Sequence, residues 1–136
     1  MDLKTDILIP VAKRIRERAD SLRVVKRFPR SGIEGWLKVE AVAALGDKVK
    51  KLQNKGPDLV LQDDLTLELK GATDLNPSWI KGGALKYNAP CLFLGDGRQP
   101  ERIAALRADG TIELIGYEVF SDGNSEWVVG IISPIS

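Results

Sequence analysis

Two short runs decide the fold of this chain: Gly56-Pro57-Asp58-Leu59-Val60-Leu61 and, after a turn, Leu67-Glu68-Leu69-Lys70-Gly71. The acidic pair at 63–64 separates them and predicts a β-hairpin with strands over 58–62 and 65–70. Leucines alternate with Glu68 and Lys70 in the second strand, so these two charged side chains share one face of the sheet. The hairpin therefore predicts an acidic residue beside a lysine, with Asp58 on the neighbouring strand.

Whether Asp58 joins Glu68 and Lys70 depends on the register of this hairpin. A two-residue turn at 63–64 places Asp58 on the face opposite Glu68. A three-residue loop over 63–65 pairs Asp58 with Lys70 and gathers all three side chains. A β-bulge near Asp58 has the same effect. We expect one of these last two arrangements.

Asp58, Glu68 and Lys70 suit metal-assisted hydrolysis of a phosphodiester. Two carboxylates with backbone and water oxygens make a site for Mg²⁺, for which Mn²⁺ can substitute. Such a metal makes hydroxide available near neutral pH, and a lysine can hold the attacking water or neutralise charge on the phosphate. The chain has no histidine and a single cysteine, Cys91, so histidine-based catalysis and thiolate metal sites are excluded.

The N-terminal region reads as a helix followed by a connection. Apolar residues at helical spacing over 3–22 predict a core-packing helix, which Thr5 or Asp6 can cap. The segment 22–28 predicts a short strand or an extended link, and Pro29 is expected to end it.

Beyond this connection, helix and strand signals alternate. Ser31-Gly32-Ile33-Glu34 is a capping-box pattern for a helix that runs to about Leu45 and stops at Gly46. The later elements are a strand over 47–53, helices over 77–87 and 100–107, a strand over 91–94 and a hairpin of 112–120 with 127–132. We expect one domain, 1–136, with an α/β fold: a mixed sheet with helices on both faces.

The net charge of +1 hides an asymmetry, because the first 56 residues carry +7 and the remaining 80 carry −6. Two basic clusters, over 13–30 and 48–55, indicate a partner with a phosphate backbone. For one such cluster alone, a solvated surface is the simpler explanation. The candidate nucleic-acid contacts are Lys48, Lys50, Lys81 and Lys86. For the last two, a solvated helix face is an equal alternative.

Pro57-Asp58 followed by Glu68-Leu69-Lys70 resembles the motif of the PD-(D/E)XK nuclease superfamily. The order of elements over about 31–95 resembles the αβββαβ core of that superfamily. The resemblance implies a restriction-endonuclease-like fold, here with an extra N-terminal helix and a C-terminal hairpin. The spacing over 32–46 also looks, weakly, like archaeal Holliday-junction resolvases and Mrr-type restriction enzymes. The glutamine that many members carry in the following helix is absent.

The resemblance also implies roles for individual residues. In that superfamily the equivalents of Asp58 and Glu68 bind the metal, and the equivalent of Lys70 is catalytic. A helix carboxylate completes the site and is carried here onto Glu34. Glu40 is the rival for that role because it points into the apolar face of the same helix.

We therefore expect a Mg²⁺-dependent endonuclease that hydrolyses DNA, structure-selective or weakly sequence-specific, and acting as a homodimer. The alternative is a catalytically inactive nuclease-fold module for nucleic-acid binding or assembly, and a third reading is an unrelated α/β interaction domain. RNA as the substrate stays open. No run reaches the ~18 apolar residues of a spanning helix, and the charged N-terminus does not suit a signal peptide. We expect a cytoplasmic protein without a membrane partner.

Overall fold

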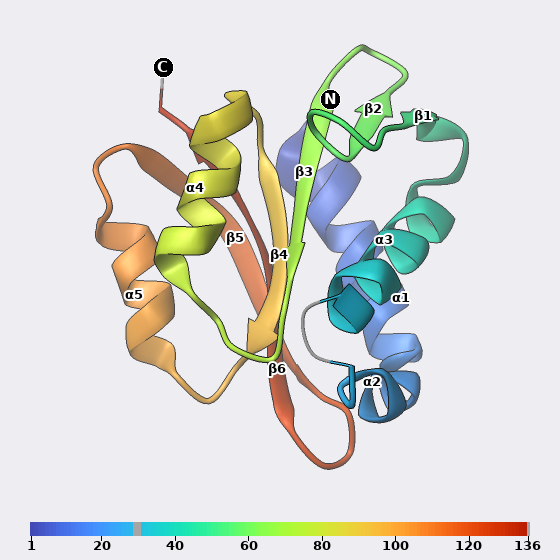
Figure 1. Ribbon diagram of the computed structural model, residues 1–136, viewed down its shortest axis with the longest axis vertical. Coiled ribbons are helices and arrows are strands. Elements are labelled where there is room, and N and C mark those ends of the chain that lie inside the picture. Colours follow the sequence, from blue (N-terminus) through green and yellow to red (C-terminus); the bar gives the residue numbers. More distant parts are fainter. Residues whose placement is uncertain (29–30, 136) are drawn as a thin grey trace.

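The computed structural model describes residues 1–28 and 31–135 (Figure 1). Its helical segments are η1 (Leu3–Leu8), α1 (Ile9–Glu17), α2 (Ala19–Val25), α3 (Ser31–Leu45), η2 (Gly46–Lys48), α4 (Pro77–Tyr87) and α5 (Pro100–Ala108). Its strands are β1 (Val49–Leu52), β2 (Leu59–Leu61), β3 (Thr66–Gly71), β4 (Cys91–Asp96), β5 (Ile112–Ser121) and β6 (Glu126–Pro134).

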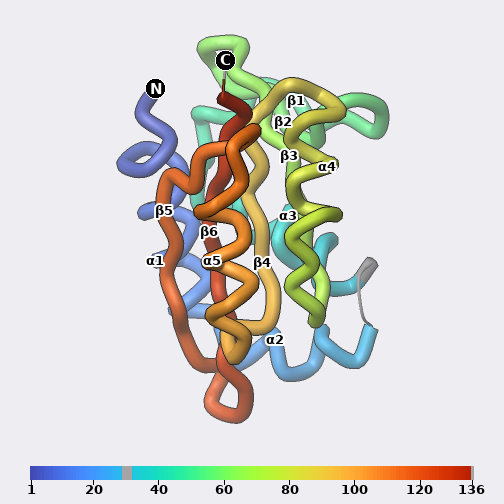
Figure 2. The backbone as a smooth tube through the Cα atoms, turned by 90° about the vertical axis from the view of Figure 1, so that its left-hand side faces the viewer, coloured from blue at the N-terminus to red at the C-terminus, as the bar shows by residue number. Residues whose placement is uncertain are grey.

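The strands form one mixed sheet in the order β1-β2-β3-β4-β6-β5. β3 and β4 run parallel, with α4 in the crossover between them, and the other neighbouring pairs are antiparallel. In Figure 1, α4 and α5 lie on one side of the sheet and α1, α2 and α3 on the other. Figure 2 shows α4 and α5 side by side over their face. The predicted α/β fold with helices on both faces is confirmed.

A hydrophobic cluster lies on each side of the sheet. The larger one joins α1, α2 and α3 to the sheet and contains Leu67 and Leu69 of β3. The smaller one lies under α4 and α5 and contains Cys91 of β4. Because side chains alternate between the faces of a strand, Glu68 and Lys70 point to the α4 side.

The N-terminal helical region has a different cap from the one predicted. Asp2 caps it rather than Thr5 or Asp6: an Asp2 oxygen accepts a hydrogen bond from Thr5 N at 2.7 Å. An Asp6 oxygen in turn accepts from Asp2 N at 2.8 Å. These reciprocal bonds satisfy N–H groups that the start of a helix leaves free. The single predicted helix is divided into η1, α1 and α2.

The prediction of a strand or extended link over 22–28 is wrong, because α2 continues through Val25 and a turn follows. Leu22 is fully buried in the larger cluster. Burial along the helical stripe therefore outweighs the β preference of the adjacent valines. Pro29, expected to end this segment, and the side chain of Ser31, expected to cap α3, lie outside the described parts.

The remaining elements are close to those predicted. Asn76 caps α4, its side-chain oxygen accepting from Trp79 N at 3.2 Å, and Pro77 occupies the first turn. β1 is shorter than the predicted 47–53 because η2 occupies the three residues before it. Within the described ranges, no helix is both long enough and apolar enough to span a bilayer.

Candidate functional site

The loop between β2 and β3 fixes the position of Asp58. Leu61 N donates to Leu65 O at 2.8 Å, so the loop comprises residues 62–64. Asp64 adopts φ +64°, the left-handed conformation that a three-residue hairpin loop requires at its last position. The loop has three residues, as one predicted arrangement required, but it lies one position earlier than the predicted 63–65.

This register brings Asp58 to Glu68 rather than to Lys70. β2 and β3 pair Leu59 with Leu67, and one further step places Asp58 opposite Glu68. Residues that face each other in antiparallel strands share a face, so the two carboxylates point the same way. Lys70 lies two residues beyond Glu68 on that face.

An unpaired edge of β3 holds the carboxylates together. Pairing with β2 ends at Leu67, and Leu69 N then donates to two side chains: Asp58 Oδ2 at 2.9 Å and Glu68 Oε1 at 3.1 Å. The Asp58 side chain thus takes the place of a strand partner. We call this part of β3, from Glu68 to Gly71, the open edge.

Glu34 reaches the open edge from α3. A Cβ added at Gly71 would lie 3.1 Å from the Glu34 Cα, so glycine allows α3 to approach β3 closely. Oε1 of Glu34 is buried and, among the described residues, has no hydrogen-bond partner. Glu34 thus offers a buried oxygen beside the two carboxylates.

The electrostatics of Glu34 link it to the same group of charges. Burial raises the pKa of the Glu34 carboxyl, and the Asp58 charge adds to this effect. The Lys70 and Lys38 ammonium groups and the Gly71 amide favour the charged form and so oppose it. Glu34 therefore interacts electrostatically with Lys38 of α3, with Lys70 of β3 and with Asp58.

Glu40, the rival of Glu34, lies elsewhere. Its side chain is 4% exposed and is held between α1 and α3 by Arg14 Nε at 2.8 Å and Arg18 Nε at 3.7 Å. Six residues separate Glu34 and Glu40, which turns them about 120° apart around a helix. Loss of either cation would leave a buried carboxylate less compensated, so Glu40 belongs to the α1–α3 contact rather than to the open edge.

Lys70 projects from the open edge under α4. Its Nζ lies 4.7 Å from the centroid of the Trp79 ring, a cation–π distance. A Cβ added at Gly83 would lie 2.7 Å from Lys70 Cε and 3.4 Å from Glu68 Cγ. Gly83 therefore makes the room in α4 that both side chains occupy. Neither Trp79 nor Gly83 is apparent as a site residue from the sequence.

Lys38 is a second cation at the site that the sequence analysis missed. Its Nζ lies 3.8 Å from Asp58 Oδ1. Lys38 follows Glu34 by four residues, so the two side chains lie on one face of α3. That spacing is a signal that could have identified it.

Asp58 and Glu68 are close enough to share a proton. Burial, together with the hydrogen bond to Asp58 and the charge of Asp58, raises the pKa of Glu68 to about 8. Burial raises the pKa of the Cys91 thiol, and the neighbouring Glu68 charge adds to this. Glu68 therefore keeps its proton to a higher pH than an ordinary glutamate, and Cys91 is an unreactive core residue.

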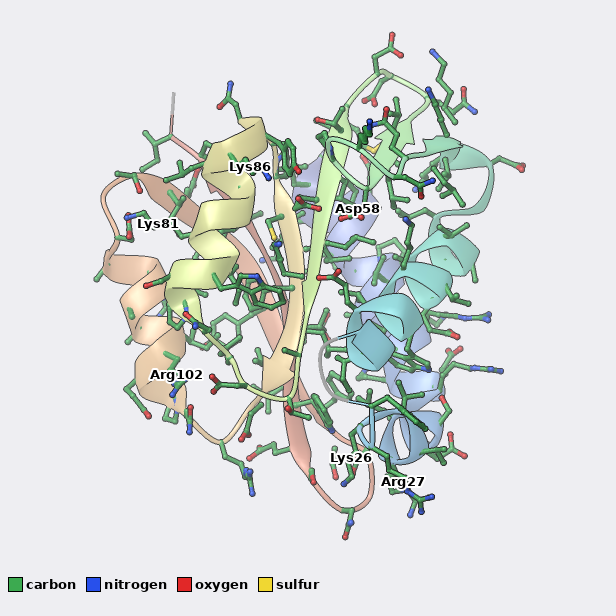
Figure 3. The ribbon with its side chains drawn as sticks, in the orientation of Figure 1. Lys26, Arg27, Asp58, Lys81, Lys86 and Arg102 are labelled. Carbon is green, nitrogen blue, oxygen red and sulfur yellow. The ribbon has the colours of Figure 1, made fainter. Side chains whose placement is uncertain are left out.

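The structure gives other partners to the lysines predicted to bind nucleic acid. Lys81 pairs with Asp109 at 2.8 Å, and the Lys86 Nζ lies 5.2 Å from the centroid of the Tyr87 ring. Figure 3 shows both lysines along α4, whereas Asp58 lies on the opposite side of β3.

In the second basic cluster, Lys48 Nζ donates to Asp6 O at 3.2 Å and Lys50 pairs with Asp64 at 2.8 Å. Lys51 is exposed, and in the register of strands β1 and β2 its backbone lies opposite that of Val60. Val60 and Asp58 are two residues apart, so Lys51 shares their face of the sheet. The irregular register between Val49 and Lys51 places Lys51 rather than Lys50 on this face.

The oxygen atoms at the open edge suit a hard divalent cation. Asp58 and Glu68 offer adjacent carboxylates, and Mg²⁺ uses few protein ligands and keeps several waters. In the described residues, no group of three or more Cys, Asp or Glu side chains is arranged to hold a metal ion. The residues therefore fit a two-carboxylate site, with Glu34 placed beside it rather than as a third ligand.

Comparisons of the chain with protein-family models, with curated proteins and with solved structures find no match. The geometry and chemistry of the open edge are therefore the basis for the functional proposal. Two features of it matter most: the Leu69 amide that joins Asp58 to Glu68, and the two lysines on either side of them.

Proposed function

We propose that this protein is a Mg²⁺-dependent endonuclease with a restriction-endonuclease-like fold that hydrolyses phosphodiester bonds in DNA. The observation that carries the proposal is the meeting of Asp58 and Glu68 at the Leu69 amide, with Lys70 on the same sheet face. The order α3-β1-β2-β3-α4-β4 supports the fold, since it is the αβββαβ order of the PD-(D/E)XK core.

Each residue at the open edge has a proposed part. Asp58 and Glu68 would hold the Mg²⁺, which would make a bound water more acidic and polarise the phosphodiester. Lys70 neutralises negative charge that develops on the phosphate. Glu34, whose buried Oε1 has no hydrogen-bond partner among the described residues, orients the attacking water and accepts its proton.

The proposed products carry a 5′-phosphate, so water attacks the phosphorus and the bond to the 3′ oxygen breaks. Lys51 lies on the site face of β1, and Lys55 is exposed in the segment that leads to Asp58. We assign both to the DNA backbone in place of Lys48, Lys50, Lys81 and Lys86, which contact other parts of the protein. A homodimer that acts on two strands, with structure-selective or weakly sequence-specific cleavage, stays part of the proposal.

The second candidate is a nuclease-fold module that binds nucleic acid without cleaving it. The Lys38–Asp58 pair favours it, because it neutralises a carboxylate without a metal ion. The glutamine absent from α4 favours it as well. The two candidates differ in whether wild-type protein binds Mg²⁺ and cleaves.

The test is Mg²⁺-supported cleavage of single-stranded, duplex, flapped and four-way DNA, with calorimetric titration of Mg²⁺ alongside. Lys70→Met should reduce cleavage about 10²–10⁴-fold and leave Mg²⁺ affinity within about twofold. Lys81→Met is the matched control, since its ammonium pairs with Asp109 on the far side of α4. It should behave as wild type.

Asp58→Asn should weaken Mg²⁺ binding as well as cleavage, because it removes a charged ligand. Cleavage that survives in the Lys70 variant would exclude this site as its source. Wild-type protein that neither binds Mg²⁺ nor cleaves any of the four substrates would overturn the proposal in favour of the non-catalytic module.

A further inference from the structure

We propose that Lys38 is a phosphate-binding residue of this site that stays with Asp58 only until a metal ion occupies that carboxylate. This inference rests on the proposed nuclease function and adds a substrate contact from α3. Without a metal ion, Lys38 contacts Asp58. With a metal ion on Asp58, Lys38 contacts a phosphate of the DNA.

The Lys38–Asp58 contact is one that can be exchanged. The Nζ to Oδ1 distance of 3.8 Å is longer than a hydrogen bond, so charge holds the pair without directional bonding. The two side chains are 30% and 24% exposed, and ion pairs that water reaches contribute little stability. A divalent cation on Asp58 removes most of the attraction, since it neutralises the same carboxylate and repels the ammonium.

The stem of Lys38 can support two positions of the ammonium group. It borders a groove of about 350 Å³ between α3 and β1, formed otherwise by Gly35, Val39, Val42, Ala43 and Leu52. A lysine stem packs along an apolar surface of this kind while its charged end stays in water. The ammonium can therefore leave Asp58 without exposing new apolar area.

Lys38 and Lys70 approach the carboxylates from opposite sides. Lys70 lies under α4 against Trp79, and Lys38 comes from α3. The charges of both lysines favour the ionised form of Glu34, so both act on the same group of carboxylates. A phosphate bound at Asp58 and Glu68 would meet the ammonium group of Lys38 from α3 and that of Lys70 from β3, an arrangement that suits a single anionic diester.

The experiment uses Lys70→Met protein as the parent, so that DNA stays intact in Mg²⁺. Lys38→Met, which keeps the apolar stem, and Lys38→Arg, which keeps the charge, are made in this parent. Lys81→Met is the matched control. Mg²⁺ affinity is measured by calorimetry. DNA affinity is measured by fluorescence anisotropy over a series of salt concentrations, with Mg²⁺ and with EDTA, and melting temperatures are recorded for each variant.

With Mg²⁺, Lys38→Met should weaken DNA binding about tenfold and reduce the slope of log affinity against log salt by about 0.9. With EDTA it should change neither, because Lys38 is then occupied by Asp58. Its Mg²⁺ affinity should be unchanged or higher, since a competing cation is gone. Lys38→Arg should keep the parental slope, and Lys81→Met should match the parent.

Equal loss of DNA affinity with Mg²⁺ and with EDTA would overturn the inference, because it would make Lys38 a fixed contact. Weaker Mg²⁺ binding, or DNA binding identical to the parent, would also overturn it. If wild-type protein cleaves DNA while Lys38→Met binds like the parent, this inference fails and the nuclease proposal stands. A wild-type protein that binds neither Mg²⁺ nor DNA overturns both.

Discussion

Glu68, a proposed metal ligand, is a buried acidic side chain that lowers the stability of the fold when it is charged. It is 5% exposed, lies against Asp58 and has its pKa raised to about 8. An ordinary glutamate in the unfolded chain titrates near 4.5. Between these values the folded protein binds the proton more tightly than the unfolded chain does. Stability therefore decreases as pH rises from about 4.5 to 8.

We predict that Glu68→Gln raises the free energy of unfolding at pH 8.5 by about 1–3 kcal/mol and changes it little at pH 4.5. One pKa unit corresponds to about 1.4 kcal/mol, and solvent near the open edge reduces the total. The measurement is urea unfolding of metal-free protein at both pH values. Glu113→Gln, at an exposed position of β5, is the control. Equal effects of Glu68→Gln at both pH values would contradict the shared proton.

At the scale of elements, α4 lies close to β3 at Gly83, and the adjacent Gly82 has different surroundings. A Cβ at Gly83 would lie 2.7 Å from Lys70 Cε, whereas a Cβ at Gly82 would have no atom within 4 Å. The two positions share a helix and differ only in the face they present. They therefore separate the effect of helix propensity from the effect on the site.

We predict that Gly83→Ala displaces Lys70 and lowers the cleavage rate about 10–100-fold, because small misplacements of a catalytic group are costly. Mg²⁺ affinity should stay within about threefold of wild type, since Asp58 is untouched. Gly82→Ala should keep full activity and stabilise the protein by about 0.5–1 kcal/mol. Single-turnover cleavage with thermal unfolding checks both variants, and equal activity of the two would show that Gly83 does not position Lys70.

A second pair of glycines tests the contact of α3 with the open edge. At Gly71 a Cβ would meet the Glu34 backbone at 3.1–3.2 Å, and at Gly35 it would meet nothing within 4 Å. We predict that Gly71→Ala destabilises the protein by about 1–3 kcal/mol, because α3 must shift. Gly35→Ala should stabilise it by up to about 1 kcal/mol. Urea unfolding measures both, and a neutral Gly71→Ala would mean that α3 moves freely against β3.

At the scale of the whole molecule, the basic residues of the first half of the chain fall into two groups. Some contact other parts of the protein, and others are exposed. Lys48, Lys50 and Arg14 contact other parts of the protein. Lys51 and Lys55 are exposed near Asp58. Net charge therefore does not by itself identify the surface that meets DNA.

We predict that Lys51→Ala with Lys55→Ala lowers the slope of log DNA affinity against log salt by up to about 1.8, one phosphate contact for each lysine. Lys50→Ala should leave the slope unchanged, because Lys51 rather than Lys50 shares the sheet face of Asp58 in the β1–β2 register. Anisotropy titrations between low and moderate salt measure these slopes. A larger effect for Lys50→Ala would place the DNA on the other face of β1.

Local patterns in the sequence are enough to predict several elements of the fold and the candidate site residues. The two-residue period of a strand is enough to place Glu68 and Lys70 on one face, and the Asn76 cap with Pro77 is enough to start α4. Asp58, Glu68 and Lys70 are candidates because of their spacing on the hairpin, and Glu34 is a candidate through the resemblance to the PD-(D/E)XK superfamily. The composition by itself excluded catalysis by histidine.

Only the tertiary structure decided which of these residues meet. The left-handed Asp64 placed the loop one residue earlier, which set Asp58 opposite Glu68. Burial of Leu22 turned a predicted strand into α2.

Packing against α1 supplied the cations that hold Glu40 away from the site. The irregular β1–β2 register turned Lys51 rather than Lys50 toward the site face. For Leu22, Glu40 and Lys51, contacts between residues distant in sequence outweigh the local preferences. The sequence pattern around each residue contains no information about such contacts.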